Sequence, residues 1–215
     1  MSAIRAVLWD FGGVILSSPF EAFNRYEAER GLPRDFLRSV NARNPHDNAW
    51  ARLERGDVTT EAFSDLFEAE SRALGHAVSG HDVLALLSGD VRAEMVAVLK
   101  RLKGAYKLAC LTNNVRHGDG PGMARTAEKA AAIAEIMTLF DQVVESSKVG
   151  VRKPEPRFYQ IACDLLGIKP TEAVFLDDLG INLKPAALMG MRTIKVGEPA
   201  KAIAELEAVL GHTLR

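Results

Sequence analysis

The chain has 215 residues, of which 47% are hydrophobic and 26% are charged, and its 27 basic residues nearly balance 28 acidic ones. This composition is typical of a soluble globular protein and does not fit a disordered, fibrous or membrane-embedded chain. A formal net charge of −1 provides no overall field for nucleic acid or a membrane surface, so we expect neither as a partner.

Five short apolar runs predict the strands of a parallel sheet, and helical patterns lie between the later ones. This alternation is typical of the α/β class, with a Rossmann-like, doubly wound core. The predicted strands are residues 6–9, 106–111, 142–144, 173–176 and 193–196. The predicted core helices are residues 91–103, 123–139, 155–167, 182–190 and 199–210, with a turn-rich loop at 117–122.

The stretch between the first two strands breaks this alternation, because it carries helical patterns and no convincing strand. Pro33 and Thr59 or Thr60 are expected helix starters. The predicted helices here are residues 20–30, 33–41, 47–55, 60–74 and 80–88. We therefore expect a core formed by residues 1–16 and 91–215, interrupted by an all-helical cap at residues 17–90.

Polar residues follow three of the predicted strands. In a doubly wound sheet, ligands bind beyond the carboxyl ends of the strands, so side chains placed there meet in one crevice. A further lysine lies in a proline-containing turn just before a helix. The candidate site residues are Asp10, Thr112, Asn113, Lys153, Asp177 and Asp178. Each element alone also fits an ordinary cap or turn, but all of them in this order favour a site.

These residue types fit phosphoryl transfer. A carboxylate such as Asp10 can act as a nucleophile, but it repels a phosphoryl group unless a divalent cation lies between them. Asp10 and Asp178 offer the oxygen ligands that Mg2+ prefers. Lys153 would neutralise phosphoryl oxygens, while Thr112 and Asn113 would donate hydrogen bonds to them. Attack by Asp10 would give an aspartyl-phosphate that water hydrolyses.

Four segments in order resemble the motifs of the haloacid dehalogenase superfamily, and the resemblance covers the whole chain. They are residues 9–15, 111–113, 152–156 and 175–178. Residues 175–186 are similar to the N-terminal phosphatase domain of soluble epoxide hydrolase. The resemblance implies a Rossmann-like core with a helical cap, and it implies no epoxide hydrolysis, which belongs to a separate domain.

The resemblance also implies roles for individual residues. Asp10 is the nucleophile and, with Asp178, a magnesium ligand, while Asp177 binds the ion through water or lies just outside its ligands. The backbone carbonyl of Gly12 completes the metal site, and Asn182 braces the fourth motif. Thr112, Asn113 and Lys153 hold the phosphoryl group, with Lys153 counted as catalytic together with Asp10.

One position departs from the family pattern. Two residues after the nucleophile, where the family usually has an aspartate acting as general acid and base, this chain has Gly12. General acid–base assistance is typically worth about 10²–10⁴ in rate, so the glycine predicts a slow enzyme unless another group substitutes. Proteins resembling bacterial glucose-1-phosphate phosphatase have a similar glycine. His46, Asp47 and Glu54 in the cap are candidates to reach the crevice.

Three functions follow from these features. The first is a magnesium-dependent phosphatase for a small phosphorylated metabolite. The second is a 2-haloacid dehalogenase, which uses an aspartate nucleophile without the second aspartate, although it needs no metal site such as Asp177 and Asp178 suggest. The third is a phospho-ligand binder weakened by Gly12.

We expect a cytoplasmic protein for two reasons. The two cysteines, Cys110 and Cys163, lie in apolar segments and are interpreted as buried thiols, and the sequence shows no visible secretion signal.

Overall fold

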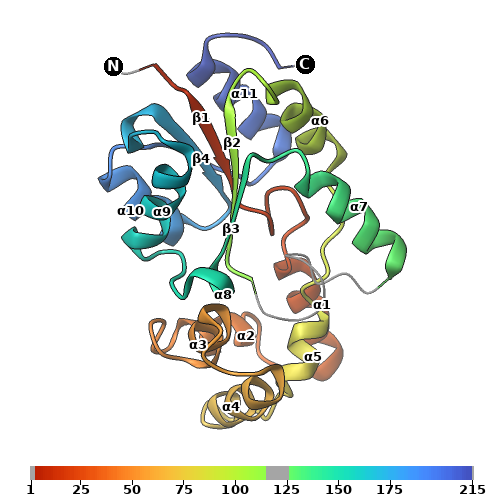
Figure 1. Ribbon diagram of the computed structural model, residues 1–215. Coiled ribbons are helices and arrows are strands. Elements are labelled where there is room, and N and C mark those ends of the chain that lie inside the picture. Colours follow the sequence, from red (N-terminus) through yellow and green to blue (C-terminus); the bar gives the residue numbers. More distant parts are fainter. Residues whose placement is uncertain (1–2, 115–125, 215) are drawn as a thin grey trace.

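A parallel sheet of five strands, in the order β3-β2-β1-β4-β5, forms the centre of the molecule (Figure 1). The computed structural model describes residues 3–114 and 126–214. All four neighbouring pairs are parallel, so the carboxyl ends of the strands share one edge, and the predicted fold class is confirmed. The strands are β1 (Ala6–Trp9), β2 (Lys107–Thr112), β3 (Gln142–Glu145), β4 (Ala173–Asp177) and β5 (Arg192–Lys195).

Strand β1 lies in the middle of the sheet and is buried on both faces. Successive side chains of a strand point to opposite faces, so Val7 and Trp9 pack into one apolar layer while Ala6 and Leu8 pack into another. The first layer is covered by α6 (Ala93–Leu102), α7 (Ala127–Met137) and α11 (Pro199–Leu210). The second is covered by α9 (Pro156–Leu166) and α10 (Gly180–Leu188).

The core elements lie within a few residues of their predicted positions, with two additions. A one-turn helix, α8 (Ser146–Val149), directly follows β3, and a 3-10 turn at Pro170–Glu172 precedes β4. The expected loop at 117–122 and the start of the helix predicted at 123–139 lie outside the described residues. None of the described helices is long and apolar enough to cross a membrane.

Every regular element between residues 17 and 90, all of which are described, is a helix. These helices group beyond the carboxyl edge of the sheet, at the bottom of Figure 1. They have an apolar core of their own, in which the ring of Trp50 lies 4.8 Å from that of Phe63 (centroid to centroid) in an edge-on arrangement. The cap helices are α1 (Phe20–Arg30), α2 (Phe36–Ala42), α3 (Ala49–Arg55), α4 (Thr60–Arg72) and α5 (Gly80–Ala85).

The chain passes between core and cap twice, and the two passages are paired. Leu16 and Val91 form an isolated antiparallel bridge, and the amide of Ser17 donates to the carbonyl of Asp90 at 2.7 Å. The Ser17 hydroxyl accepts in turn from the amide of Asp90 at 2.9 Å. The cap is therefore connected to the core through a short ribbon formed by two antiparallel segments of the chain. Our exact boundaries, at residues 16 and 91, stay a prediction.

The start of α2 differs from the expectation. The pattern predicted a helix beginning at Pro33, whereas α2 begins at Phe36, after a tight turn in which Asp35 has a left-handed backbone (φ 60°). The buried side chain of Glu27, on α1, accepts hydrogen bonds from the amides of Asp35 (2.8 Å) and Leu37 (2.9 Å). A carboxylate from another helix thus binds the unpaired backbone N–H groups at the start of α2, and the helix does not begin at Pro33. Thr59, in contrast, caps α4 as predicted.

We expect Glu27→Ala to lower the free energy of unfolding by about 1–3 kcal/mol, because the buried amide of Leu37 and the partly buried amide of Asp35 would lose their acceptor. Urea denaturation measures this change. Glu29→Ala, an exposed change on the same helix, is the matched control and should alter stability by less than about 0.5 kcal/mol. Equal effects of the two substitutions would contradict the capping role of Glu27.

Candidate active site at the carboxyl edge of the sheet

Asp10 occupies the residue directly after the central strand. Its amide donates to the carbonyl of Leu176 at 2.8 Å, which continues the β1–β4 pairing by one step and fixes the backbone at the sheet edge. The carboxylate accepts a hydrogen bond from the amide of Phe11 at 2.6 Å, and the residue is only 7% exposed. The candidate nucleophile is therefore held rigidly at the point where β1 ends between β2 and β4.

Lys153 brings a buried positive charge to this carboxylate. Its ammonium lies 2.8 Å from Asp10 Oδ1 and 2.8 Å from Asp177 Oδ2, and the side chain is 1% exposed. Burial alone would lower the pKa of Lys153, but the charges of Asp10 and Asp177 raise it above its ordinary value. The lysine therefore stays protonated, as neutralisation of an anionic substrate requires.

Three carboxylates surround this single cation. Asp10, Asp177 and Asp178 each offer an oxygen within 4.8 Å of the others. Burial, reinforced by repulsion from Asp177 and Asp178, raises the pKa of Asp10 well above its usual range in spite of Lys153. Burial and repulsion from Asp177 raise the pKa of Asp178 to about 6. Such an excess of carboxylate oxygens fits a hard divalent cation such as Mg2+, which prefers oxygen ligands and would relieve the repulsion.

The three carboxylates differ in how far the protein already satisfies them. Both carboxylate oxygens of Asp177 accept hydrogen bonds from the side-chain amide of Asn182, at 3.1 Å each. Asp177 also accepts from the backbone amide of Leu179 at 2.8 Å and from Lys153. Asp178 receives a longer contact, 3.3 Å, from the hydroxyl of Ser18. The contacts of Asp177 suit a residue just outside the metal ligands, and those of Asp178 leave it more accessible to an ion.

Asn182 itself is anchored by its backbone. Its carbonyl accepts a hydrogen bond from the Tyr159 hydroxyl at 2.7 Å, and the residue is buried. The aromatic ring of Tyr159 packs edge-on against Phe175, with 5.6 Å between the ring centroids. Asn182 thus connects β4 to α9 and α10, and its role in bracing the fourth motif stays a prediction.

Two glycines after the nucleophile have different surroundings. Gly13 has φ +81°, and a Cβ there would lie 2.3 Å from Asp178 Oδ2, so no other residue fits without moving that carboxylate. A Cβ on Gly12 would meet nothing within 4 Å. The position where the family usually has an aspartate thus has room for a side chain. The role of the Gly12 carbonyl as a metal ligand stays a prediction.

Thr112 and Asn113 end β2 beside this cluster, but the side chain of Asn113 is already engaged. Its Nδ2 donates to the carbonyl of Lys153 (2.9 Å) and to Glu54 Oε2 (3.1 Å), and its Oδ1 accepts from the amide of Lys153 (2.8 Å). Both amide hydrogens therefore bind protein oxygens in this state. Thr112 is 4% exposed. Their contacts to a phosphoryl group stay predictions.

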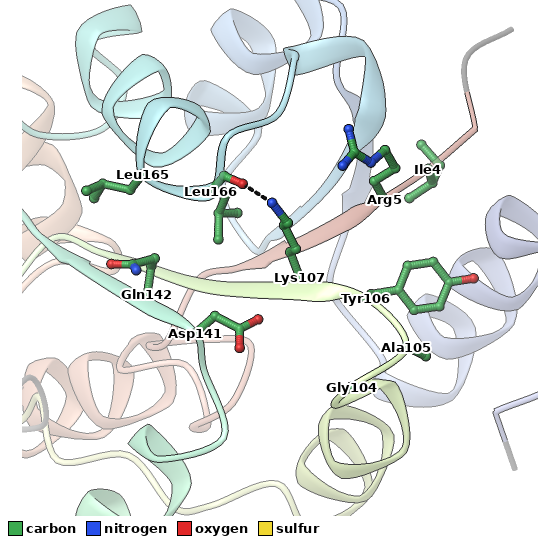
Figure 2. A pocket seen from close by; sticks show the side chains of 10 residues that line it. All are labelled: Ile4, Arg5, Gly104, Ala105, Tyr106, Lys107, Asp141, Gln142, Leu165 and Leu166. Carbon is green, nitrogen blue, oxygen red and sulfur yellow. Dashed lines mark hydrogen bonds between the residues drawn. The ribbon is translucent and has the colours of Figure 1, made fainter.

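A separate cavity, of about 570 Å³, lies at the opposite edge of the sheet, where β1 and β2 begin (Figure 2). Its charged groups are used within the protein: Lys107 donates to the Leu166 carbonyl, and Asp141 accepts from the amide of Leu108 at 2.8 Å. Arg5 pairs with Glu172. This cavity lies at the end of the sheet opposite the cluster of Asp10, Lys153 and Asp177, and its charged groups already have partners within the protein.

The comparisons with known proteins agree with this arrangement. Residues 4–190 match the family model of haloacid dehalogenase-like hydrolases. The chain belongs to this family. The match contains the candidate nucleophile, the buried lysine, both acidic residues after β4 and the helical cap, so all of the site described above lies within the family region.

The curated relatives of this haloacid dehalogenase-like hydrolase include longer proteins. It is 35% identical to mouse acyl-CoA dehydrogenase family member 10 and 34% identical to mouse bifunctional epoxide hydrolase 2, over 98% and 97% of this chain. The chain spans only 19% and 39% of those two relatives. It is also 24% identical to (S)-2-haloacid dehalogenase 1 of Pseudomonas sp. (strain CBS-3), over 91% of this chain and 86% of the relative.

Solved structures share the fold. A haloacid dehalogenase family enzyme of Bacteroides thetaiotaomicron, in complex with magnesium and inorganic phosphate, superposes with a TM-score of 0.60 at 20% identity, covering 91% of this chain and 95% of that one. At this identity the likeness establishes the architecture of the core and cap and no more.

Three features of the site had no sequence signal strong enough to identify them. Ser18 contacts Asp178 from the start of the cap. Asn114 is buried and binds Glu145, which joins the ends of β2 and β3. Of the three cap candidates, Glu54 contacts Asn113 and Arg152 of the core, whereas Asp47 pairs with Arg52 inside the cap. The sequence named Glu54 as a cap candidate but did not indicate these partners.

We expect Asp178→Asn to raise the melting temperature of the metal-free protein at pH 7.5 by about 2–8 °C. Because the pKa of Asp178 is raised from 3.8 to about 6, the folded state favours its neutral form and loses that advantage as the pH rises through about 6. The neutral asparagine avoids this loss. The difference in melting temperature between Asp178→Asn and the wild type should therefore vanish near pH 4, where Asp178 is itself mostly neutral in the folded protein.

Differential scanning calorimetry in EDTA at the two pH values measures the effect, and the exposed change Asp65→Asn is the control. Adding Mg2+ should then stabilise the wild-type protein more than Asp178→Asn. A lower melting temperature of Asp178→Asn at pH 7.5 without metal would show that the carboxylate stabilises the fold instead of straining it.

Proposed function

We propose that this protein is a magnesium-dependent phosphatase-type hydrolase that acts on a small phosphorylated metabolite through an aspartyl-phosphate at Asp10. The observation that carries the proposal is the cluster of Asp10, Asp177 and Asp178, of which the first two pair with the buried Lys153. Three carboxylates and one ammonium suit a site in which a metal cation and a phosphoryl anion bind together. The magnesium and phosphate named in the Bacteroides thetaiotaomicron structure support the same reading.

The chain's own residues supply most of the chemistry. Asp10 attacks phosphorus with a carboxylate oxygen, the bond to the leaving oxygen breaks, and the leaving group departs with a proton taken from solvent. Water then attacks the acyl phosphate, which releases inorganic phosphate and restores Asp10. Lys153 balances the negative charge on the transferred group, and Asp177 keeps the lysine aligned. Asp10 and Asp178 would hold Mg2+, which would supply the electrostatic shielding that lets two anions approach.

Hydrolytic dehalogenation is the second candidate, and two observations favour it. Gly12 offers no acid or base, which a halide leaving group does not require, and curated 2-haloacid dehalogenases are among the relatives. Asp178 argues against it, because a third carboxylate in the site hinders binding of a carboxylate substrate unless a cation neutralises it. A third reading, a phospho-ligand binder with little turnover, also rests on Gly12.

We expect metal-dependent release of inorganic phosphate from at least one member of a panel of sugar, nucleotide and small organic phosphates. Asp10→Asn should lower kcat by roughly 10³-fold or more, because it removes the nucleophile. The variant's melting temperature and circular dichroism check that it is folded. Chloride release from 2-chloropropionate in EDTA, without phosphate release, would replace the phosphatase by the dehalogenase. Phosphate-ester binding without either reaction would support the weakened binder.

The open space at Gly12 gives a second test. We expect Gly12→Asp to raise kcat for alkyl phosphates, which are poor leaving groups, by about tenfold or more, because the new carboxyl can protonate the departing oxygen. The gain should be small for p-nitrophenyl phosphate, whose leaving group needs little help. Gly12→Asn, with the same shape and no proton to transfer, is the matched control. The idea fails if the two variants hydrolyse alkyl phosphates at the same rate.

A further inference from the structure

One carboxylate of the cap reaches into the core beside the candidate active site. Glu54 lies in the last turn of α3, and its Oε2 accepts the bond from Asn113 and forms an ion pair with the Nε of Arg152. The side chains of Glu54 and Arg152 are each only 15% exposed. Helix α3 packs against α8 of the core, which is where cap and core approach each other in Figure 1.

Asn113 transmits this contact to Lys153. Its amide group binds both backbone polar groups of the lysine, accepting from the N–H and donating to the carbonyl. The opposite orientation of the amide would direct its oxygen at the Glu54 carboxylate and the Lys153 carbonyl, two acceptors that repel it. Glu54 therefore reinforces the orientation of Asn113 that holds the lysine backbone.

Arg152 keeps the charge of Glu54 compensated and ties down a second part of the cap. Its Nη1 donates to the carbonyl of Pro45 at 3.0 Å, in the loop before α3. Arg152 precedes Lys153 directly in the chain, so the two core partners of Glu54 both act on the same short segment. A charge-assisted contact of this low exposure is stronger than a surface ion pair.

We propose that Glu54 is a positioning residue that makes the alignment of Lys153 depend on the closed cap. The chain passes from core to cap and back at residues 16–17 and 90–91, so a swing of the cap about this ribbon withdraws Glu54 from Asn113 and Arg152 together. Asn113, which binds the backbone of Lys153, then lacks its support from Glu54. Full alignment of Lys153 with Asp10 returns when the cap closes over the substrate and excludes water. This inference rests on the proposed function, because it assumes that Lys153 and Asp10 perform the hydrolysis.

Kinetics of two substitutions distinguish positioning from a simple latch. With p-nitrophenyl phosphate and Mg2+, we expect Glu54→Ala to lower kcat by roughly tenfold or more with a smaller change in KM, because misplacement of the lysine affects the chemical step. Glu54→Gln keeps an oxygen that accepts from Asn113 and should recover most of kcat, although it loses the ion pair with Arg152. Equal losses in both variants would mean that only the ion pair matters and would overturn the proposal.

Amide hydrogen exchange tests the same inference without turnover. In the substrate-free protein we expect the amide of Lys153, which donates to Asn113 Oδ1, to exchange roughly tenfold faster in Glu54→Ala than in the wild type. Asp57→Asn is the matched control, since Asp57 is an exposed cap carboxylate paired with Arg55 inside the cap, and it should leave this amide unchanged. Glu54→Gln provides the same comparison, with a smaller expected increase, if Glu54→Ala does not fold.

The two measurements separate failure of this inference from failure of the proposed function. Unchanged exchange at Lys153 in folded Glu54→Ala would overturn the positioning role even in an active phosphatase. Faster exchange in a protein that releases no phosphate from any substrate would refute the phosphatase and leave the positioning of Lys153 by Glu54 supported.

Discussion

Burial of the Lys153 ammonium is the constraint on which the rest of the site depends. Removing a charged group from water costs several kcal/mol, and only close, well-aligned counter-charges offset that cost. Asp10 and Asp177 provide them at 2.8 Å each. They can do so because β1 and β4 are adjacent and in register, with Trp9 beside Leu176, so that Asp10, which follows β1, lies beside Asp177 at the end of β4. The order of strands in the sheet is thus a condition for keeping the lysine buried.

The same cluster is over-supplied with negative charge. Lys153 compensates two carboxylates, and Asp178 adds a third that lies against the turn at Gly13. Burial, with this repulsion added to it, raises the pKa values of Asp10 and Asp178 and so favours their protonated forms. A site that stabilised only the fold would dispense with the third carboxylate. Its presence is understandable when a cation is part of the working state, and the strain in the metal-free protein is then a cost of function.

The fold and the candidate residues could be predicted from the sequence because their signals are local. The apolar run at Ala6–Trp9 identifies a buried strand by itself, and the shared edge of parallel strands brings Asp10 and Asp177 together without further information. The start of α2 and the role of Asn113 depend on partners far along the chain. Glu27, on α1, caps the start of α2 where a start at Pro33 was expected, and Glu54 lies 59 residues from its partner Asn113. No pattern of hydrophobicity or spacing encodes such side-chain contacts, and only the folded arrangement reveals them.

The replacement of the acid–base aspartate by Gly12 places more of the catalytic demand on position and charge. Under the proposed mechanism, nothing at residue 12 protonates the leaving group, so the rate depends on a good leaving group, on charge neutralisation by Lys153 and metal, and on accurate alignment with Asp10. The cap can influence this alignment through contacts seen in the structure. The chain from Glu54 through Asn113 to Lys153 provides that influence. A family member without the second aspartate therefore has a stronger physical reason to couple its lysine to cap closure than one that retains it.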